Sequence, residues 1–185
     1  MSWLYLTRAS GIVALVLIVA SMVWGFFFSA RATGTRRRPN WWLDLHNYLG
    51  GLGFVFTLVH IVAAYLDANS GIGLVQVFVP MTASGWAWGI TWGVLATYVF
   101  AAVVFTSWPK RRFGRRTWLV VHLLSIPATV AAAGHAWMVG ESRPYHWFPM
   151  LLALLAGLAV YPGVLRLARV VERRRHPRRP AEAAS

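Results

Sequence analysis

Five long apolar stretches constrain the fold of this chain more than any other feature. They lie at roughly 9–30, 43–66, 86–108, 117–139 and 147–168. Each is close to the ~20 residues that an α-helix needs to cross a bilayer. Charged residues make up only 12% of the chain, whereas a soluble domain carries about 25%. We therefore predict an all-α, polytopic membrane helix bundle with about five transmembrane helices.

The connections between these stretches are short enough to favour a single domain. We expect this domain at 1–170, followed by a basic tail at 171–185 that we expect to be disordered. The segment 67–85 is weakly charged and apolar in its middle, and we interpret it as an interfacial loop. Cysteine is absent, which excludes disulfides, thiolate metal sites and iron–sulfur clusters. Any redox chemistry would therefore need a bound cofactor.

Positive charge is concentrated on one predicted side of the membrane. Of the 18 Lys and Arg residues, four lie at 31–38, five at 110–116 and seven at 166–179. With five crossings these segments share one side, and Arg8 and Arg143 fall on the other. Positive charge marks the cytoplasmic face, so we expect a cell membrane protein, such as one of a bacterial inner membrane, with its N-terminus outside and its C-terminus cytoplasmic. The net charge of +13 is then explained by topology and the lipid bilayer, and not by nucleic acid.

Two pairs of histidines lie inside the apolar stretches. His46 and His60 are 14 residues apart in the second stretch, and His122 and His135 are 13 residues apart in the fourth. At about 1.5 Å per residue, each spacing spans roughly 20 Å of helix. Ionisable side chains in a bilayer are costly and usually functional. Because the two helices run in the same direction, we expect His46 level with His122 (the inner pair) and His60 level with His135 (the outer pair).

Two stacked haems would explain this pattern best. Zinc prefers a single tetrahedral cluster of ligands, which two pairs roughly 20 Å apart cannot form. Imidazole is a common axial ligand of haem iron, and helix bundles build cofactor sites from facing helices. We predict two haems, one bound by each pair. The alternative is that the histidines only form hydrogen bonds that pack the bundle.

The spacing of 13 residues in the fourth stretch is awkward for this hypothesis. At about 100° per residue, an ideal helix would aim His122 and His135 about 140° apart. Pro127 lies between them and can kink the helix. Otherwise the two haems would approach different sides of this helix. Small residues near the histidines could make room for a macrocycle or serve close helix packing, and these are Gly50, Gly51, Gly53 and Gly134.

Cations near the ends of the stretches could pair with anionic haem propionates. Arg143 is the candidate at the outer end, and Arg115 is one of several at the inner end. His146 and His176 lie outside the apolar stretches and are interpreted as ordinary loop and tail residues.

The histidines belong to a longer combination of motifs in 105–137. Thr-Ser ends one helix and a basic loop follows. Then come Arg-x-x-Trp-x-x-x-His and a second His. The residues of this combination are Thr106, Ser107, Arg115, Trp118, His122 and His135. With the partner helix at 43–62, this resembles ferric reductase-like transmembrane domains, over roughly 40–165. That family includes the membrane parts of ferric reductases and NADPH oxidases and the haem-binding subunit of bacterial methionine sulfoxide reductase systems. The resemblance implies two haem b groups, four histidine iron ligands and electron flow from the cytoplasm outward.

One departure from the family affects the expected electron donor. Ferric reductases and NADPH oxidases carry a cytoplasmic flavin and nicotinamide domain after the last helix, whereas this sequence continues only into a short basic tail without a Gly-rich fingerprint. We therefore expect a component of an oxidoreductase that takes electrons from a separate flavoprotein, quinol or reductase subunit. The outer acceptor is open.

Two alternative functions remain at this stage. The first is a quinol-linked cytochrome b561-type subunit of a larger redox complex, with a quinone pocket lined by Asp44, Asn47 and Tyr48. The second is a non-redox membrane transport or assembly protein that uses histidines for protons or metal. Proton paths usually pair histidines with carboxylates inside the membrane, but the carboxylates Asp44, Asp67 and Glu141 lie near the ends of the stretches.

Overall fold

The chain is described by a computed structural model that covers residues 2–30, 41–107, 114–140 and 142–175. Its described residues form seven helices: α1 (Ser2–Ala30), α2 (Trp41–Leu66), α3 (Leu74–Phe78), α4 (Ala87–Ser107), α5 (Arg115–Leu123), α6 (Ser125–Val139) and α7 (Trp147–Arg175). The predicted all-α architecture is confirmed, and five segments of the described chain are long and apolar enough to cross a membrane. The fourth of these consists of α5 and α6 together.

The helices extend beyond the apolar stretches that predicted them. α1 begins at Ser2, and α7 continues to Arg175. Residues 171–175, expected as the start of the tail, are therefore helical, and residues 176–185 lie outside the described part of the chain. A bilayer limits the length of the apolar run and not that of the helix, because backbone hydrogen bonds continue equally well in water.

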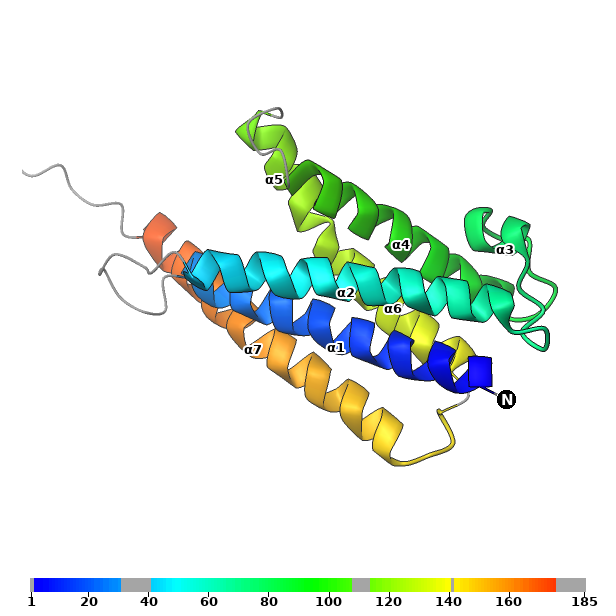
Figure 1. Ribbon diagram of the computed structural model, residues 1–185. Helices are drawn as coiled ribbons and strands as arrows, with labels where there is room; N and C mark the ends of the chain where they lie inside the picture. Colours follow the sequence, from blue (N-terminus) through cyan, green and yellow to red (C-terminus); the bar gives the residue numbers. More distant parts are fainter. Residues whose placement is uncertain (1, 31–40, 108–113, 141, 176–185) are drawn as a thin grey trace, which may run out of the picture.

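α1 is the central helix of the bundle, and it packs along α2, α7 and part of α6, while α4 packs along α5 and α6 (Figure 1). Within the described residues, α2 has no comparable contact with α5 or α6. One buried cluster joins α1 to α7 through Leu15, Val19 and Leu155, and another joins α4 to α6 through Ala96, Phe100 and Ala128. The bundle thus contains two packed groups of helices, α1 with α2 and α7, and α4 with α5 and α6. The histidines of α2 in the first group face those of α5 and α6 in the second.

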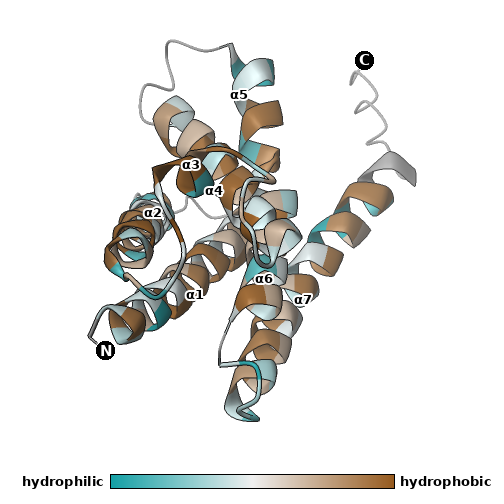
Figure 2. Ribbon diagram, turned by 90° about the vertical axis from the view of Figure 1, so that its right-hand side faces the viewer, coloured by the Kyte–Doolittle hydropathy of each residue, from teal (hydrophilic) through white to brown (hydrophobic). Residues whose placement is uncertain are grey.

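Large apolar side chains remain exposed over much of the bundle surface. Val130 and Met150, for example, are 69% and 70% exposed. Figure 2 shows hydrophobic residues along the long helices and hydrophilic residues near several of their ends. In water such a surface would be unfavourable, but in a bilayer it is the surface that contacts lipid. The exposure therefore supports a multi-pass membrane protein.

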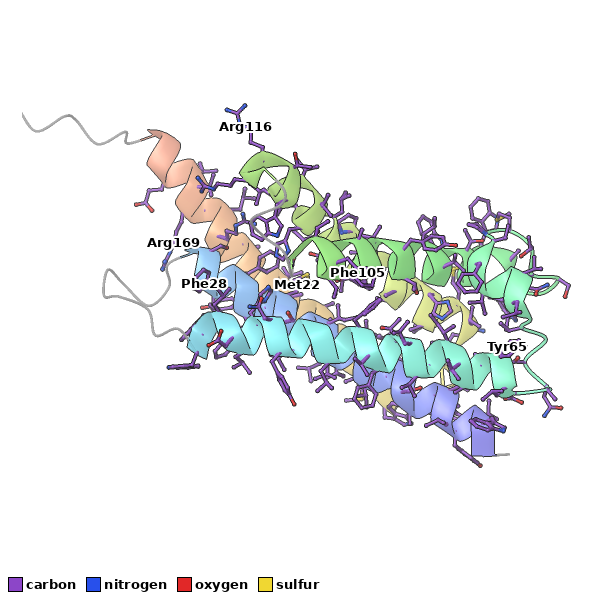
Figure 3. The ribbon with its side chains drawn as sticks, turned by 45° about the horizontal axis from the view of Figure 1, so that its top comes forward. Met22, Phe28, Tyr65, Phe105, Arg116 and Arg169 are labelled. Atoms are coloured by element: carbon purple, nitrogen blue, oxygen red, sulfur yellow. The ribbon has the colours of Figure 1, made fainter. Side chains whose placement is uncertain are left out.

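The described charged residues differ between the two ends of the bundle. Arg115, Arg116, Arg166 and Arg169 lie at the start of α5 and in the last turns of α7. Figure 3 shows Arg116 and Arg169 at the end opposite to Tyr65. At the other end the described cations are Arg8 and Arg143. The expected basic segment at 31–38 and residues 110–113 lie outside the described residues, so the predicted orientation stays a prediction.

The segment between α2 and α4 is attached to the bundle by α4. The backbone N–H of Met81 donates to Thr91 Oγ1 at 2.9 Å, and the hydroxyl of Tyr98 donates to the carbonyl of Phe78. The apolar side chains of α3 are nevertheless exposed, with Leu74 and Phe78 at 59% and 58%. This arrangement fits a loop that lies at the membrane surface.

Candidate functional site

The four predicted histidines lie in two pairs across the bundle. His46 and His60 project from α2, His122 from α5 and His135 from α6. The ring centres of the inner pair, His46 and His122, are 5.8 Å apart with an interplanar angle of 68°. Those of the outer pair are 6.0 Å apart with an angle of 85°. Each pair therefore bridges α2 and the α5–α6 segment at its own level.

A break in the fourth span lets both of its histidines face α2. α5 ends at Leu123 and α6 begins at Ser125. Pro127 has no N–H and its ring would clash with the carbonyl four residues earlier, which disrupts a regular helix there. The N–H of Leu124 is shared between the carbonyls of Val120 and Val121 at 3.3 and 3.1 Å. An ideal straight helix would aim the two histidines about 140° apart, whereas in the structure each of them lies close to a histidine ring of α2.

Three of the histidines are oriented by hydrogen bonds to the backbone of a neighbouring helix. Nδ1 of His60 lies 2.8 Å from the carbonyl oxygen of Thr7 in α1. Nδ1 of His135 lies 2.8 Å from the carbonyl of Gly89 in α4, and Nδ1 of His46 lies 2.9 Å from the carbonyl of Ser21 in α1. A carbonyl only accepts, so each Nδ1 carries the proton and donates. In this tautomer Nε2 is the unprotonated ring nitrogen, which is the one that can bind a metal.

His122 is oriented differently, by an aromatic side chain of its own helix. Its ring stacks on Trp118, with ring centres 4.9 Å apart and an interplanar angle of 21°. The indole N–H of Trp118 donates in turn to Ser107 Oγ on α4 at 3.3 Å. Trp118 thus connects the inner pair to α4.

The separation of the paired rings fits one metal ion held between two imidazoles. A metal–imidazole bond is about 2 Å, and a nitrogen lies about 1 Å from its ring centre, so two ligands in line have centres about 6 Å apart. The observed distances are 5.8 and 6.0 Å. In contrast, the described residues contain no group of three or more His, Asp or Glu side chains that could hold a metal ion. A haem iron takes at most two axial ligands from the protein, because the macrocycle supplies the other four.

Two of the glycines singled out from the sequence lie in the interface between α1 and α2. A Cβ on Gly53 would meet the side chain and backbone of Ile18 at 2.9 and 3.3 Å, so Gly53 allows close packing of α1 on α2. Gly50 faces Ser21 in the same interface, and Gly51 and Gly134 have open space beside them. The glycines in contact with histidine rings are Gly11, Gly25 and Gly93. The sequence held one signal for them, because Gly11 and Gly25 repeat the spacing of His46 and His60.

The two candidate propionate cations lie at opposite ends of the bundle. The guanidinium of Arg143 lies 6.0 Å from the ring centre of Trp86. Both residues line a pocket of about 330 Å³ that also includes Met138 and Val139, one turn beyond His135. Arg115 is the first residue of α5 and is exposed. The structure thus places one cation beyond each histidine pair.

The residues proposed for a quinone pocket lie at the surface of α2. Asp44, Asn47 and Tyr48 are exposed, and Tyr48 is 65% exposed. His146 is an exposed residue between α6 and α7, as expected for a loop residue.

Comparison with known proteins identifies a related family. No curated protein matches the chain significantly. A family model, ferric reductase like transmembrane component, matches residues 10–133, which is more than half of the chain. The matched range contains most of α1, both histidines of α2, and His122, and it ends just before His135. The chain is therefore a member of the ferric reductase-like transmembrane component family, and this membership suggests electron transfer in a membrane.

Proposed function

We propose that the protein is a dihaem b-type cytochrome that carries electrons across a cell membrane. His46 and His122 would bind the inner haem, and His60 and His135 the outer haem. The observation that carries this proposal is the presence of two imidazole pairs, each with ring centres close to the about 6 Å expected for two ligands of one metal ion. Bound in this way, haem iron exchanges one electron between its ferric and ferrous states.

The separation of the two levels suits transfer across a bilayer. His46 and His60 are 14 residues apart, which corresponds to about 21 Å along a helix. The hydrocarbon core of a bilayer is about 30 Å thick. Two redox centres at these levels would divide one long crossing into shorter steps, which electrons tunnel through far faster.

The histidines and their neighbours would also tune the redox potential. A ring that donates its Nδ1–H to a carbonyl becomes a more basic ligand at Nε2. A more basic ligand favours the ferric state and lowers the potential. Three of the four ligands have such a bond, to Thr7, Ser21 and Gly89. Arg143 and Arg115 would pair with anionic propionates at the two ends of the bundle.

The direction of transfer follows from the predicted orientation. With the basic end cytoplasmic, electrons would enter at the inner haem from a separate flavoprotein, quinol or reductase subunit. They would leave at the outer haem to an acceptor at the outer face. The protein would thus be the membrane component of an oxidoreductase that needs a separate donor.

A haem count on the purified protein tests the proposal. Reduced-minus-oxidised spectra and a pyridine haemochrome assay should give two b haems per chain. His60→Ala and His135→Ala should each lose the same single haem, and His46→Ala and His122→Ala should each lose the other. A colourless protein from haem-replete cells would overturn the proposal, as would the loss of different haems within one pair. Adding a quinol or a flavin reductase to the same sample then distinguishes the donors.

A further inference from the structure

Three of the four histidines share one structural arrangement with a neighbouring helix. In each case, Nδ1–H donates to a backbone carbonyl, and the residue four positions after that carbonyl is a glycine that touches the same ring. The three sets of carbonyl, glycine and ring are Thr7, Gly11 and His60; Ser21, Gly25 and His46; and Gly89, Gly93 and His135. Two sets lie on α1 and one on α4.

Helix geometry explains why the glycine stands at this position. Inside an α-helix, the carbonyl of residue i already accepts the N–H of residue i+4. A ring that reaches the second lone pair of that carbonyl must lie against the surface of residue i+4. A Cβ on Gly11 would lie 2.8 Å from Nδ1 of His60, and one on Gly93 would lie 2.7 Å from Nδ1 of His135. Optimal non-bonded contacts are about 3.5–4.0 Å, so the ring would have to move.

The contact at Gly25 is of the same kind but less tight. A Cβ there would lie 3.1 Å from Cε1 and 3.4 Å from Nδ1 of His46. His46 also has Ser21 Oγ 3.1 Å from its Nδ1. A methyl group at Gly25 therefore needs a smaller displacement of the His46 ring than one at Gly11 or Gly93 needs of its ring.

We propose that Gly11, Gly25 and Gly93 are positioning residues that set the ring planes of three haem ligands, an inference that rests on the proposed function. These histidine-contact glycines admit the ring close enough for its Nδ1–H to reach the carbonyl. The hydrogen bond then determines both the tautomer and the rotation of the ring. Any side chain at these positions displaces the ring, weakens the bond and raises the potential of the haem.

The proposal assigns each glycine to one haem. Gly11 and Gly93 act on the two ligands of the outer haem, and Gly25 acts on one ligand of the inner haem. The fourth ligand, His122, has Trp118 stacked on it. An alanine at Gly11 or Gly93 therefore changes the outer haem, and an alanine at Gly25 changes the inner haem.

Close helix packing is the competing explanation, and Gly53 provides the control for it. Gly53 touches α1 through Ile18, without a histidine among its three nearest contacts. Gly157 on α7, with open space beside it, controls for the substitution itself. Alanine is a better helix former than glycine, so any damage in these variants comes from the contact made by the new methyl group.

The experiment compares Gly11→Ala, Gly25→Ala and Gly93→Ala with Gly53→Ala and Gly157→Ala, in membranes and after purification. The readouts are the haem-to-protein ratio, the midpoint potentials from a redox titration, and the electron paramagnetic resonance of the ferric haems. Crossed imidazole planes leave two iron d orbitals close in energy and give a large g anisotropy, so ring rotation shifts that signal. In each of the three glycine variants we expect only the assigned haem to change. Either its resonance signal is altered and its midpoint potential rises, or that haem is lost. Gly53→Ala should lower the stability of the protein and leave the resonance signals and midpoint potentials of both haems unchanged.

A double variant keeps the test decisive when a glycine variant is poorly produced. In Gly11→Ala/His60→Ala the ring that meets the new methyl group is gone. The yield of protein with an intact inner haem should recover to that of His60→Ala alone, because the two changes are coupled. Failure to recover would overturn the proposal and assign Gly11 to helix packing.

Two further outcomes separate the proposals. The proposed role of the glycines would be overturned if all three glycine variants kept the resonance signals and midpoint potentials of the wild type. It would also be overturned if Gly53→Ala changed the haems in the same way. In both cases the proposal of two haems would stand. A wild-type protein without haem would instead overturn the proposed function itself.

Discussion

The inner and outer histidine pairs have similar ring separations but are held in different ways. Both outer rings donate to carbonyls of neighbouring helices, His60 to α1 and His135 to α4. In the inner pair His46 donates to α1, whereas His122 stacks on Trp118 of its own short helix. The outer rings are thus held directly by carbonyls of α1 and α4, whereas α4 reaches the inner pair through the indole N–H of Trp118, which donates to Ser107. Similar ring separations can therefore rest on different kinds of support.

The largest expected effect is loss of a whole haem, and it tests whether the two levels are independent. The hydrogen bond of His46 and the stacking of His122 on Trp118 do not involve the His135 side chain. His135→Ala should therefore lose the outer haem and keep the inner one. His122→Ala should do the reverse. Difference spectra and a haemochrome assay should show one remaining haem per chain in each variant. Loss of both haems in His135→Ala would mean that the levels form one cooperative site.

Pro127→Ala should affect the inner pair more than the outer pair. Without proline, α5 and α6 can join into one regular helix. Because α6 is the longer helix and packs along α4, the shorter α5 should be the part that rotates. His122 then turns away from His46, and the inner haem is lost or weakly bound while the outer haem is kept. Separate redox titration of the two haems measures this, and equal damage to both would contradict the role of the break.

Trp118→Ala should change the inner haem alone, to a smaller extent. It removes an aromatic stack of about 1 kcal/mol and the indole N–H that donates to Ser107. We expect a broadened or shifted resonance signal of the inner ferric haem, with the haem still bound. Trp118→Phe, which keeps a ring for stacking, serves as the matched control and should lie between wild type and Trp118→Ala. An unchanged inner signal in Trp118→Ala would show that the stack does not orient His122.

Ser21→Ala should produce the smallest effect. The Ser21 hydroxyl donates to the carbonyl of His46 at 3.0 Å, and the carbonyl of Ser21, which accepts from Nδ1, remains in the variant. The lost bond is worth about 0.5–1.5 kcal/mol, so the thermal midpoint should fall slightly. The inner potential should shift less than in Gly25→Ala, and the outer potential should stay constant. A larger shift than in Gly25→Ala would make the hydroxyl, and not the carbonyl, the main partner of His46.

Several features of this protein followed from local composition and spacing alone. The five crossings were predictable because a bilayer requires about 20 apolar residues per helix whatever the neighbours are. The equal levels of His46 with His122 and of His60 with His135 followed from sequence spacing and chain direction, since helical rise is constant. The membership in a ferric reductase-like family also rested on residues that can be read directly, such as Arg115, Trp118 and His122.

Contacts between helices were decided only by the tertiary structure. A helix that is apolar all round carries no stripe to show which side faces a neighbour, so nothing in the sequence marked α1 as the central helix. For the same reason, the glycines nearest to the histidines in sequence have no histidine ring among their nearest contacts, whereas Gly11, Gly25 and Gly93 reach the rings from other helices. Pro127 predicted a kink, but only the arrangement of α5 and α6 determined that both histidines face α2. Rotation about a helix axis and the choice of neighbour depend on the whole bundle, and a local sequence pattern does not contain them.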